Sequence, residues 1–109
     1  MNKYRNVKVE VNGMKFDSAR ECKRYFDLCL MQKTGSIKGL QRQVSFCLIP
    51  SYKLSNGKTE RGVDYIADFV YYTKDGRYIV EDSKGYRTKE YIIKKKLMLD
   101  QWGIEILET

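Results

Sequence analysis

Alternation of apolar and polar side chains is the main pattern in this chain, and it predicts half-buried β-strands. In the middle and later parts of the chain it marks three strands: residues 40–48, 64–72 and 77–84. Residues 73–76 have the composition of a turn, so the last two strands should form a hairpin. Near the N-terminus, Asn12-Gly13 separates two shorter alternating runs. This dipeptide predicts a further hairpin, because both turn positions need positive φ.

Helical spacing follows the N-terminal hairpin. Ser18 and Glu21 have the spacing of a capping box, which marks the start of a helix, and Gly35 suits its end. Apolar residues at helical spacing predict its buried stripe: Cys22, Tyr25, Phe26, Cys29 and Leu30. The sequence therefore predicts an amphipathic helix between Ser18 and Gly35.

A second helix is predicted from an N-cap at Thr88 to about Gln101, and Gly103 should end it. The apolar side of this helix is expected to contain Tyr91, Ile92, Met98, Leu99 and Trp102. Residues 104–107 then form a short final strand, whereas Gly85 should break the strand before the helix.

The element order is hairpin, helix, three strands, helix and strand. It predicts an α/β fold with a mixed central β-sheet flanked by helices. Residues 1–109 are expected to form a single domain, since they contain no repeat, no low-complexity segment and no linker composition. Residues 51–62 are polar and contain glycine, so a mobile loop is expected there.

The charge balance adds a partner class. Lysine and arginine total 21 against 14 aspartate and glutamate, which gives a net charge of +7. Such a field attracts polyanions, so nucleic acid is the leading partner and an anionic membrane surface the second. No apolar run approaches the roughly 20 residues of a membrane span, and no signal-peptide pattern follows Met1. We therefore expect a cytoplasmic protein without a membrane partner.

The cysteine and histidine counts limit the chemistry. Cys22, Cys29 and Cys47 form no CxxC pair and are expected to be reduced thiols, the first two in the core. The sequence has no histidine, which argues against a zinc site and excludes histidine-dependent nucleophilic mechanisms. Acid–base chemistry must then use carboxylate, lysine, tyrosine or metal-bound water.

One face of the later hairpin concentrates the candidate chemistry. If the turn centres near Asp75, Asp68 lies opposite Asp82, and Lys84 shares their face because side chains alternate with a period of two. The apolar residues expected on this face are Ile66, Val70, Tyr78 and Val80. Two carboxylates and an ammonium group that converge among apolar residues suit a divalent metal beside a phosphate.

Each of these residues also has a purely structural interpretation. Asp82 and Lys84 could form a weak ion pair on a sheet surface, and Asp68 could discourage pairing at a sheet edge. Glu81 is expected on the opposite face, although a slipped register would exchange it with Asp82. The set as a whole favours a metal site over these separate roles.

Glu21 is the candidate third carboxylate. On the predicted helix it shares a side with Tyr25 and Leu28, so it faces partly inward. Its capping-box role competes with a metal role, because a side chain folded back onto the N-cap amide should not reach a metal. Glu21 would be free for the metal if Asp17 capped the helix instead.

The ordered motifs resemble those of the PD-(D/E)XK nuclease superfamily. Asp68 on one strand is followed by Asp82-Ser83-Lys84 on the next, and Glu21 lies on a preceding helix. The arrangement is similar to a family of small phage-encoded proteins, formerly catalogued as a domain of unknown function, that is assigned to this superfamily. The resemblance covers most of the chain. It implies a restriction-endonuclease-like core preceded by the N-terminal β-hairpin.

The resemblance also implies how a metal would be held. Asp68 and Asp82 would bind Mg²⁺ directly, with Mn²⁺ as a substitute, and the Ser83 carbonyl would add a ligand. Glu21 would hold a ligating water or a second metal. Lys84 would orient the attacking water and neutralise charge on the phosphate.

Basic residues cluster after the motif, between residues 84 and 96. In related nucleases the following helix contributes a basic residue near the active centre, and the sequence leaves open which of Lys94, Lys95 and Lys96 does so. Lys96 is expected on a solvated helix face. The residues expected to contact nucleic acid are Gln43, Tyr86, Arg87, Lys89, Lys94 and Lys95.

The sequence thus predicts a phage-encoded, metal-dependent DNA endonuclease that hydrolyses phosphodiester bonds with a metal-activated water. Branched DNA and duplex DNA are both candidate substrates. Because no separate recognition motif is present, specificity would come from DNA shape, a homodimer or a phage or host partner protein. The alternatives are a non-catalytic basic DNA-binding module and a phage adaptor protein that retains the fold.

Overall fold

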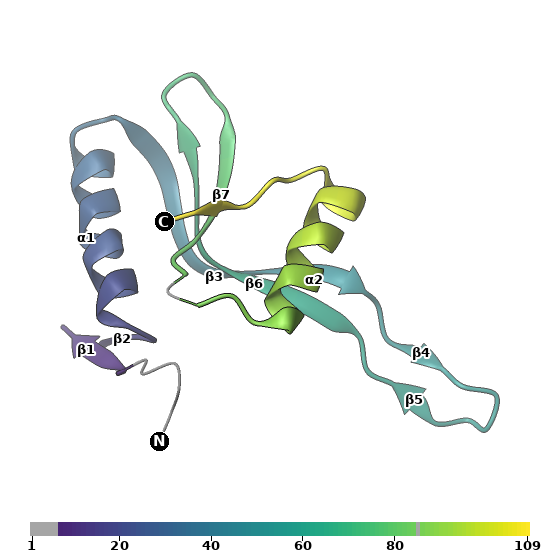
Figure 1. The fold of residues 1–109 in the computed structure, drawn as a ribbon. Coiled ribbons are helices and arrows are strands. Elements are labelled where there is room, and N and C mark those ends of the chain that lie inside the picture. The colour runs from purple at the N-terminus through teal and green to yellow at the C-terminus, as the bar shows by residue number, and fades with distance from the viewer. Residues whose placement is uncertain (1–6, 85) are drawn as a thin grey trace.

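The chain forms an open mixed sheet with two helices and a separate N-terminal hairpin (Figure 1). The computed structural model describes residues 7–84 and 86–109. Its elements are β1 (Val9–Val11), β2 (Met14–Phe16), α1 (Ala19–Lys33), β3 (Ile37–Ile49), β4 (Tyr52–Lys53), β5 (Thr59–Glu60), β6 (Val63–Thr73), β7 (Tyr78–Asp82), α2 (Lys89–Leu97), the π-helical turn η1 (Met98–Trp102) and β8 (Leu107–Glu108). The central sheet has the order β3-β6-β7-β8, in which β8 runs parallel to β7 and the other pairs are antiparallel. The predicted mixed α/β fold with an N-terminal hairpin is confirmed.

The two predicted hairpins have the expected register and turn. Phe69 of β6 lies opposite Glu81 of β7, so paired positions sum to 150. β7 ends at Asp82, two residues earlier than expected, and Gly85 lies outside the described residues. In the β1–β2 turn, Asn12 and Gly13 both have positive φ, as the dipeptide predicts.

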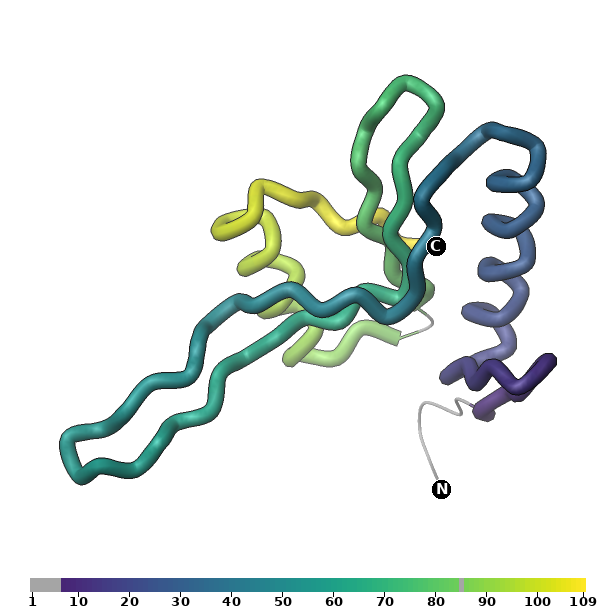
Figure 2. Tube along the Cα trace, turned by 180° about the vertical axis from the view of Figure 1, so that it is seen from behind, coloured from purple at the N-terminus to yellow at the C-terminus, as the bar shows by residue number. Residues whose placement is uncertain are grey.

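The long β3–β6 ribbon bends along its length (Figure 2). Gln43 and Asp68 lie between the paired positions Arg42–Phe69 and Val44–Ala67 of this ribbon. Gln43 has a left-handed backbone with φ of 54°, a conformation that bulky residues rarely adopt. On β6, Ala67 and Val70 belong to the same apolar cluster, and this spacing of three interrupts the alternation of faces across Asp68. Ile66, expected beside the site, is 54% exposed and lines the same cavity as Asp82 and Lys84.

The bend lets one sheet bury two apolar clusters. The first packs α1 on the sheet and contains Leu28, Ile37, Phe69 and Tyr71. The second packs α2 and η1 and contains Phe46, Leu48, Tyr65, Ala67, Val70, Val80, Tyr91, Met98 and Ile106. Asp68 thus lies between a residue of one cluster and a residue of the other.

The helix α1 begins and ends where the sequence predicts, but it buries a different face. The Ser18 hydroxyl accepts the Glu21 N–H, and the chain turns left-handed after the helix at Gly35 (φ 86°). Phe26 and Leu30 of the predicted stripe are exposed, whereas Leu28 is fully buried. The bent sheet selects the stripe through Leu28, because its Phe69 and Tyr71 rings meet α1 there.

The second helix is shorter than predicted. Thr88 caps it as expected, but the α-helix ends at Leu97 and a π-helical turn continues to Trp102. Of the predicted apolar side, Tyr91 and Met98 are buried, while Ile92, Leu99 and Trp102 remain exposed. The final strand also lies later than predicted, at residues 107–108 in place of 104–107.

Residues 51–62, expected to be a mobile loop, contain two short paired strands that form a hairpin. β4 pairs with β5 in antiparallel register and prolongs the β3–β6 ribbon (Figures 1 and 2). Gly57 has a φ of 84°, and the Lys58 N–H donates to the Asn56 side chain at 2.9 Å. Asn56-Gly57 is the same dipeptide as Asn12-Gly13, but here only the glycine has a positive φ, so the turn is of another type.

The three cysteines are free thiols, and Cys22 is buried as expected for a core residue. Cys29 is half-buried and Cys47 is exposed. Among residues 7–84 and 86–109, no helix has the length and apolar character that crossing a bilayer requires.

Candidate functional site

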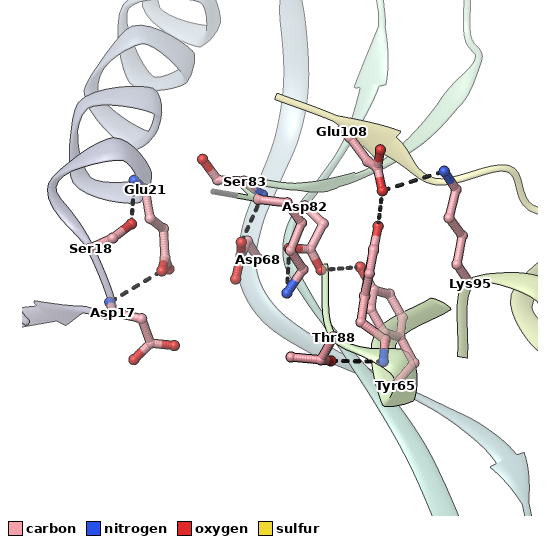
Figure 3. A network of polar contacts seen from close by, with 12 residues as sticks. Asp17, Ser18, Glu21, Tyr65, Asp68, Asp82, Ser83, Thr88, Lys95 and Glu108 are labelled. Atoms are coloured by element: carbon pink, nitrogen blue, oxygen red, sulfur yellow. Dashed lines mark hydrogen bonds and ion pairs between the residues drawn. The ribbon is translucent and has the colours of Figure 1, made fainter. Parts of the chain in front are cut away.

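The end of β7 brings three of the predicted site residues together. The Ser83 N–H donates to Asp68 Oδ2 at 2.8 Å, which ties β6 to the residue after β7. Asp82 is buried, and its Oδ2 accepts the Tyr65 hydroxyl at 2.6 Å. Lys84 Nζ lies 3.2 Å from Asp82 Oδ1, so Asp68, Asp82 and Lys84 share one location (Figure 3).

The electrostatics of this location are unusual for a carboxylate. Burial, followed by the nearby charge of Asp82, raises the pKa of Asp68 to about 8, against the lowering effect of the Ser83 N–H. Burial, followed by the charge of Asp82, also raises the pKa of Tyr65. The two aspartates therefore repel each other in a poorly solvated place, and a cation between them would relieve that repulsion.

Glu21 approaches the same location from α1 and is nearly fully buried. One carboxylate oxygen accepts the Asp17 N–H at 3.2 Å, and the other accepts Gln43 Nε2 at 3.2 Å. Ser18, not Asp17, is the N-cap. Glu21 Oε1 thus turns back to the amide of Asp17, the residue before the N-cap (Figure 3), and not to the N–H of the N-cap itself. The expected competition between capping and a metal role stays a prediction.

The pKa of Glu21 is raised as well. Burial is the main cause, and the charges of Asp17 and Asp82 add to it. The Asp17 N–H and the Arg42 guanidinium, 3.7 Å from Glu21 Oε2, act in the opposite direction. The charge of Asp82 is thus felt at both Glu21 and Asp68.

Two adjoining cavities open onto these groups. A small one of about 100 Å³ is lined by Asp17, Ser18, Glu21, Asp68, Ser83, Lys84 and Tyr86. A larger one of about 240 Å³ is lined by Asp64, Tyr65, Ile66, Asp82, Lys84, Thr88, Glu90, Tyr91 and Lys94. Lys84 borders both, so its ammonium group separates a chamber beside Asp68 from one beside Asp82.

The donor set suits a hard divalent cation, although it is not a preformed three-carboxylate cage. Asp82 Oδ1 is buried and accepts no hydrogen bond, and its neighbour is the Lys84 ammonium. Asp68 and Asp82 supply carboxylate oxygens, which Mg²⁺ prefers. In the described part of the chain, no group of three or more acidic or cysteine side chains is arranged to hold a metal. The expectation that Glu21 joins the two aspartates as a ready ligand is therefore not met by this arrangement.

The basic residues predicted to bind nucleic acid fall into two groups. Lys94 lines the larger cavity with Asp82 and Lys84, so the lysine of α2 that faces the site is Lys94. Lys89 is exposed at the first residue of α2. Arg87 and Lys95 are instead paired with Glu108 on β8.

The remaining predicted contacts lie close to the carboxylates. Gln43 donates to Glu21 from the bend of β3, and Tyr86 lines the small cavity. Lys96 is exposed, as expected for a solvated helix face, and borders a different, apolar pocket with Ile92 and Leu99.

Glu108 is a residue of this region that the sequence analysis missed. Its carboxylate accepts the Tyr91 hydroxyl at 2.7 Å and pairs with Lys95 (Figure 3). It also pairs with Arg87. The Tyr91 ring in turn lies 4.4 Å from Lys84 Nζ, a cation–π contact. Burial acts to raise the pKa of Glu108, but the three partners outweigh it and the pKa is lowered. Only the parallel pairing of Asp82 with Glu108 places it here, and local sequence carries no signal of that pairing.

Replacement of Glu108 by alanine should lower the free energy of unfolding by about 1 to 3 kcal/mol, because the Tyr91 hydroxyl loses its acceptor and two cations lose their shared partner. Arg87→Ala is the control and should change stability by less than about 1 kcal/mol, since this side chain is mostly exposed. Urea denaturation of the three proteins measures both effects. Equal losses in the two variants would contradict a central role for Glu108.

Glu81 lies on the other face of the sheet, as predicted, and belongs to a separate network. It is fully buried, accepts Arg24 Nε at 2.5 Å and Tyr71 Oη at 2.5 Å, and also accepts the Thr109 hydroxyl. Burial, together with the bond to Glu81, raises the pKa of Tyr71 to about 12. Glu81 is therefore fixed on the α1 side and does not exchange with Asp82.

Comparison with known proteins gives one result. The model of a family described as "Protein of unknown function (DUF1064)" matches residues 1–105. No curated protein and no solved structure gives a significant match.

Proposed function

The chain belongs to the DUF1064 family, and we propose that it is a metal-dependent DNA endonuclease of the PD-(D/E)XK superfamily. The observation that carries the proposal is the pair of half-buried Asp68, in the middle of β6, and buried Asp82, at the end of β7, beside Lys84. Two repelling carboxylates next to an ammonium group are poor for stability alone, but they suit a site that takes up a cation and a phosphate.

The roles follow from the contacts. Asp68 and Asp82 would hold Mg²⁺ or Mn²⁺, and Ser83 fixes Asp68 through its N–H. The metal would polarise the scissile phosphate and lower the pKa of a bound water. Lys84, held over the Tyr91 ring and beside Asp82, is placed to neutralise a phosphate oxygen. Glu21 faces the small cavity and could hold a water there.

The charge around the site supports a nucleic-acid substrate. Lys94 faces the cavity that contains Asp82, and Lys89 is exposed on the same helix. Together with the net charge of +7, these lysines favour phosphate contacts and a binding affinity that falls as salt rises. A phage origin, a cytoplasmic location and a homodimer are parts of the same proposal.

One observation favours a second candidate, a DNA-binding module without catalysis. The acidic side chains do not form a three-membered metal group, and the Lys84 ammonium already neutralises Asp82. If the Lys84–Asp82 ion pair kept a metal from binding, the protein would bind DNA through its lysines without cutting it.

The test is cleavage of supercoiled plasmid and of a four-way junction, with Mg²⁺, with Mn²⁺ or with EDTA, by the wild type and by the variants Asp82→Ala and Lys84→Ala. We expect metal-dependent cutting that both variants lose. Asp100→Ala, which removes an exposed carboxylate on η1, is the control and should cut normally. Absence of cutting by the wild type, with equal DNA affinity in all four proteins, would favour the binding module.

A further inference from the structure

The β3–β6 ribbon continues beyond the core as a protruding hairpin, which we call the arm and define as residues 50–62 (Figures 1 and 2). Every residue from 49 to 62 is exposed, so the described part of the chain packs nothing over either face of the arm. The arm still has regular geometry, with two cross-strand pairs and a closed Asn56-Gly57 turn. An ordered hairpin that adds no core contact indicates a role in binding rather than in stability.

We infer that the arm enters the major groove of duplex DNA about one helical turn from the cut, which makes duplex DNA the substrate class. The inference deepens the proposed function and rests on it for the position of the cut. The major groove is wide enough for a two-stranded β-ribbon, and a ribbon exposed on both faces can be enclosed by the groove walls.

The side chains of the arm fit this partner. Lys53 pairs with Thr59 across the ribbon, and exposed Arg61 follows directly after β5. The arm thus presents two cations and a hydroxyl group, which suit phosphates and base edges. Glu60 is the single acidic residue of the arm against three basic ones, the third being Lys58.

The distance from the bend of the ribbon to its tip is close to the length of one turn of DNA. From the bend at Gln43 to the tip at Asn56 the ribbon spans about 13 residues, or about 40 Å at the rise of a β-strand. One turn of B-DNA is about 34 to 36 Å. Since Asp68 lies at the bend, the arm would reach the groove about one turn from the scissile phosphate.

At the base of the arm, the backbone at Gly62 lies very close to the backbone of residues 49–51. An added Cβ at Gly62 would lie 2.5 Å from the Ile49 carbonyl oxygen and 3.0 Å from the Ser51 N atom. The two strands therefore approach each other there more closely than any other residue type allows. Such a junction limits how the arm swings relative to the sheet that carries the candidate site.

A second copy of this chain is the competing occupant, and the arm suits it less well. Its apolar side chains are Tyr52 and Leu54, with Ile49 just before its base, which is little apolar surface for a stable dimer. Two arms with the same excess of positive charge would also repel.

The experiment compares two variants of equal net charge. The arm variant carries Lys53→Gln, Lys58→Gln and Arg61→Gln. The control variant carries Lys33→Gln, Lys38→Gln and Lys74→Gln, which are exposed lysines of α1, β3 and the β6–β7 turn. Affinity for a blunt duplex of about two turns and for single-stranded DNA is measured in EDTA over a range of salt. Light scattering gives the mass of each protein.

The arm variant should lose duplex affinity, with the slope of log affinity against log salt reduced by about 2 to 3, while the control changes it by less than about 1. Its affinity for single-stranded DNA should stay within a few-fold of the control. Methylation of guanine N7, a major-groove atom, should be blocked by the wild type and not by the arm variant. Equal slopes in the two variants, or a change of mass confined to the arm variant, would overturn the inference.

The outcome is separable from that of the proposed function. The binding measurement contains EDTA and needs no cleavage. A loss of affinity in the arm variant, with no cutting by the wild type, would refute the nuclease proposal and support the groove contact. Cutting by the wild type, with unchanged affinity in the arm variant, would support the nuclease proposal and refute the groove contact.

Discussion

Asp68→Asn is expected to make the metal-free protein more stable at pH 8 than the wild type. Burial and the charge of Asp82 raise the pKa of Asp68 from 3.8 to about 8. The folded state therefore keeps a proton that the unfolded chain releases, and stability falls as pH rises between these two values. The slope from this group reaches at most about 1.4 kcal/mol for each pH unit. Asparagine carries no such proton and can still accept the Ser83 N–H.

The measurement is urea denaturation in EDTA at several pH values from about 4 to about 8. The difference in free energy of unfolding between variant and wild type should grow with pH in this window. Because the charges of Asp82 and Glu21 act on Asp68, the difference reports the Asp68 proton together with its interaction with these two neighbours. Asp100→Asn, an exposed carboxylate, is the control and should show a constant difference.

Added Mg²⁺ extends the same test. A cation bound between Asp68 and Asp82 replaces the retained proton, so Mg²⁺ should stabilise the wild type more at pH 8 than at pH 5. The Asp68→Asn variant should respond little. A wild type whose stability rises with pH through the window, or an asparagine variant with the same pH slope, would show that the Asp68 carboxyl is ionised in the folded state.

The buried ion pair on the other face of the sheet gives the largest expected loss of stability. Glu81 is fully buried, and Arg24 from α1 is its counter-ion, with Nε 2.5 Å from one carboxylate oxygen and Nη2 3.1 Å from the other. Arg24→Met would leave this carboxylate with the hydroxyl groups of Tyr71 and Thr109 but without a positive charge. We expect a loss of about 3 to 5 kcal/mol, because an uncompensated charge remains in the interior.

Two further variants give the controls. Lys23→Met removes the neighbouring cation of α1, which is 81% exposed and pairs with Asp27, and should cost less than about 1 kcal/mol. Arg24→Met combined with Glu81→Gln removes the buried charge and keeps an acceptor for Tyr71, so most of the loss should be recovered. Thermal and urea unfolding measure all three. A loss in the double variant as large as in Arg24→Met would mean that packing of the arginine stem, not charge, is what the sheet requires.

Local patterns were sufficient for the elements and for the register of the central hairpin. Turn residues and a period of two fix how β6 and β7 pair, and a hydroxyl residue before a helical pattern fixes where α1 and α2 begin. The hairpin of the arm could also have been predicted, because Asn56-Gly57 is the same dipeptide as Asn12-Gly13.

The faces of the elements were harder to predict, because a helix can carry overlapping stripes. Leu28 and Leu30 both lie near the apolar side of α1, and the rings of Phe69 and Tyr71 decide that Leu28 is the buried one. On β6, the bend at Asp68 breaks the alternation on which the expectation for Ile66 rested. Periodicity orders side chains within an element, but it does not state which partner the element meets.

By itself, the sequence determined that Asp68, Asp82 and Lys84 would meet, since a hairpin brings its own strands together at a fixed register. Only the tertiary structure decided what surrounds them. It brought Glu108 to the Tyr91 hydroxyl through a parallel strand pair. It also turned Glu21 toward Gln43 and set Lys94 in the cavity beside Asp82. These neighbours come from segments far apart in the chain, and contacts at such separation depend on how the sheet bends and packs, which no local pattern encodes.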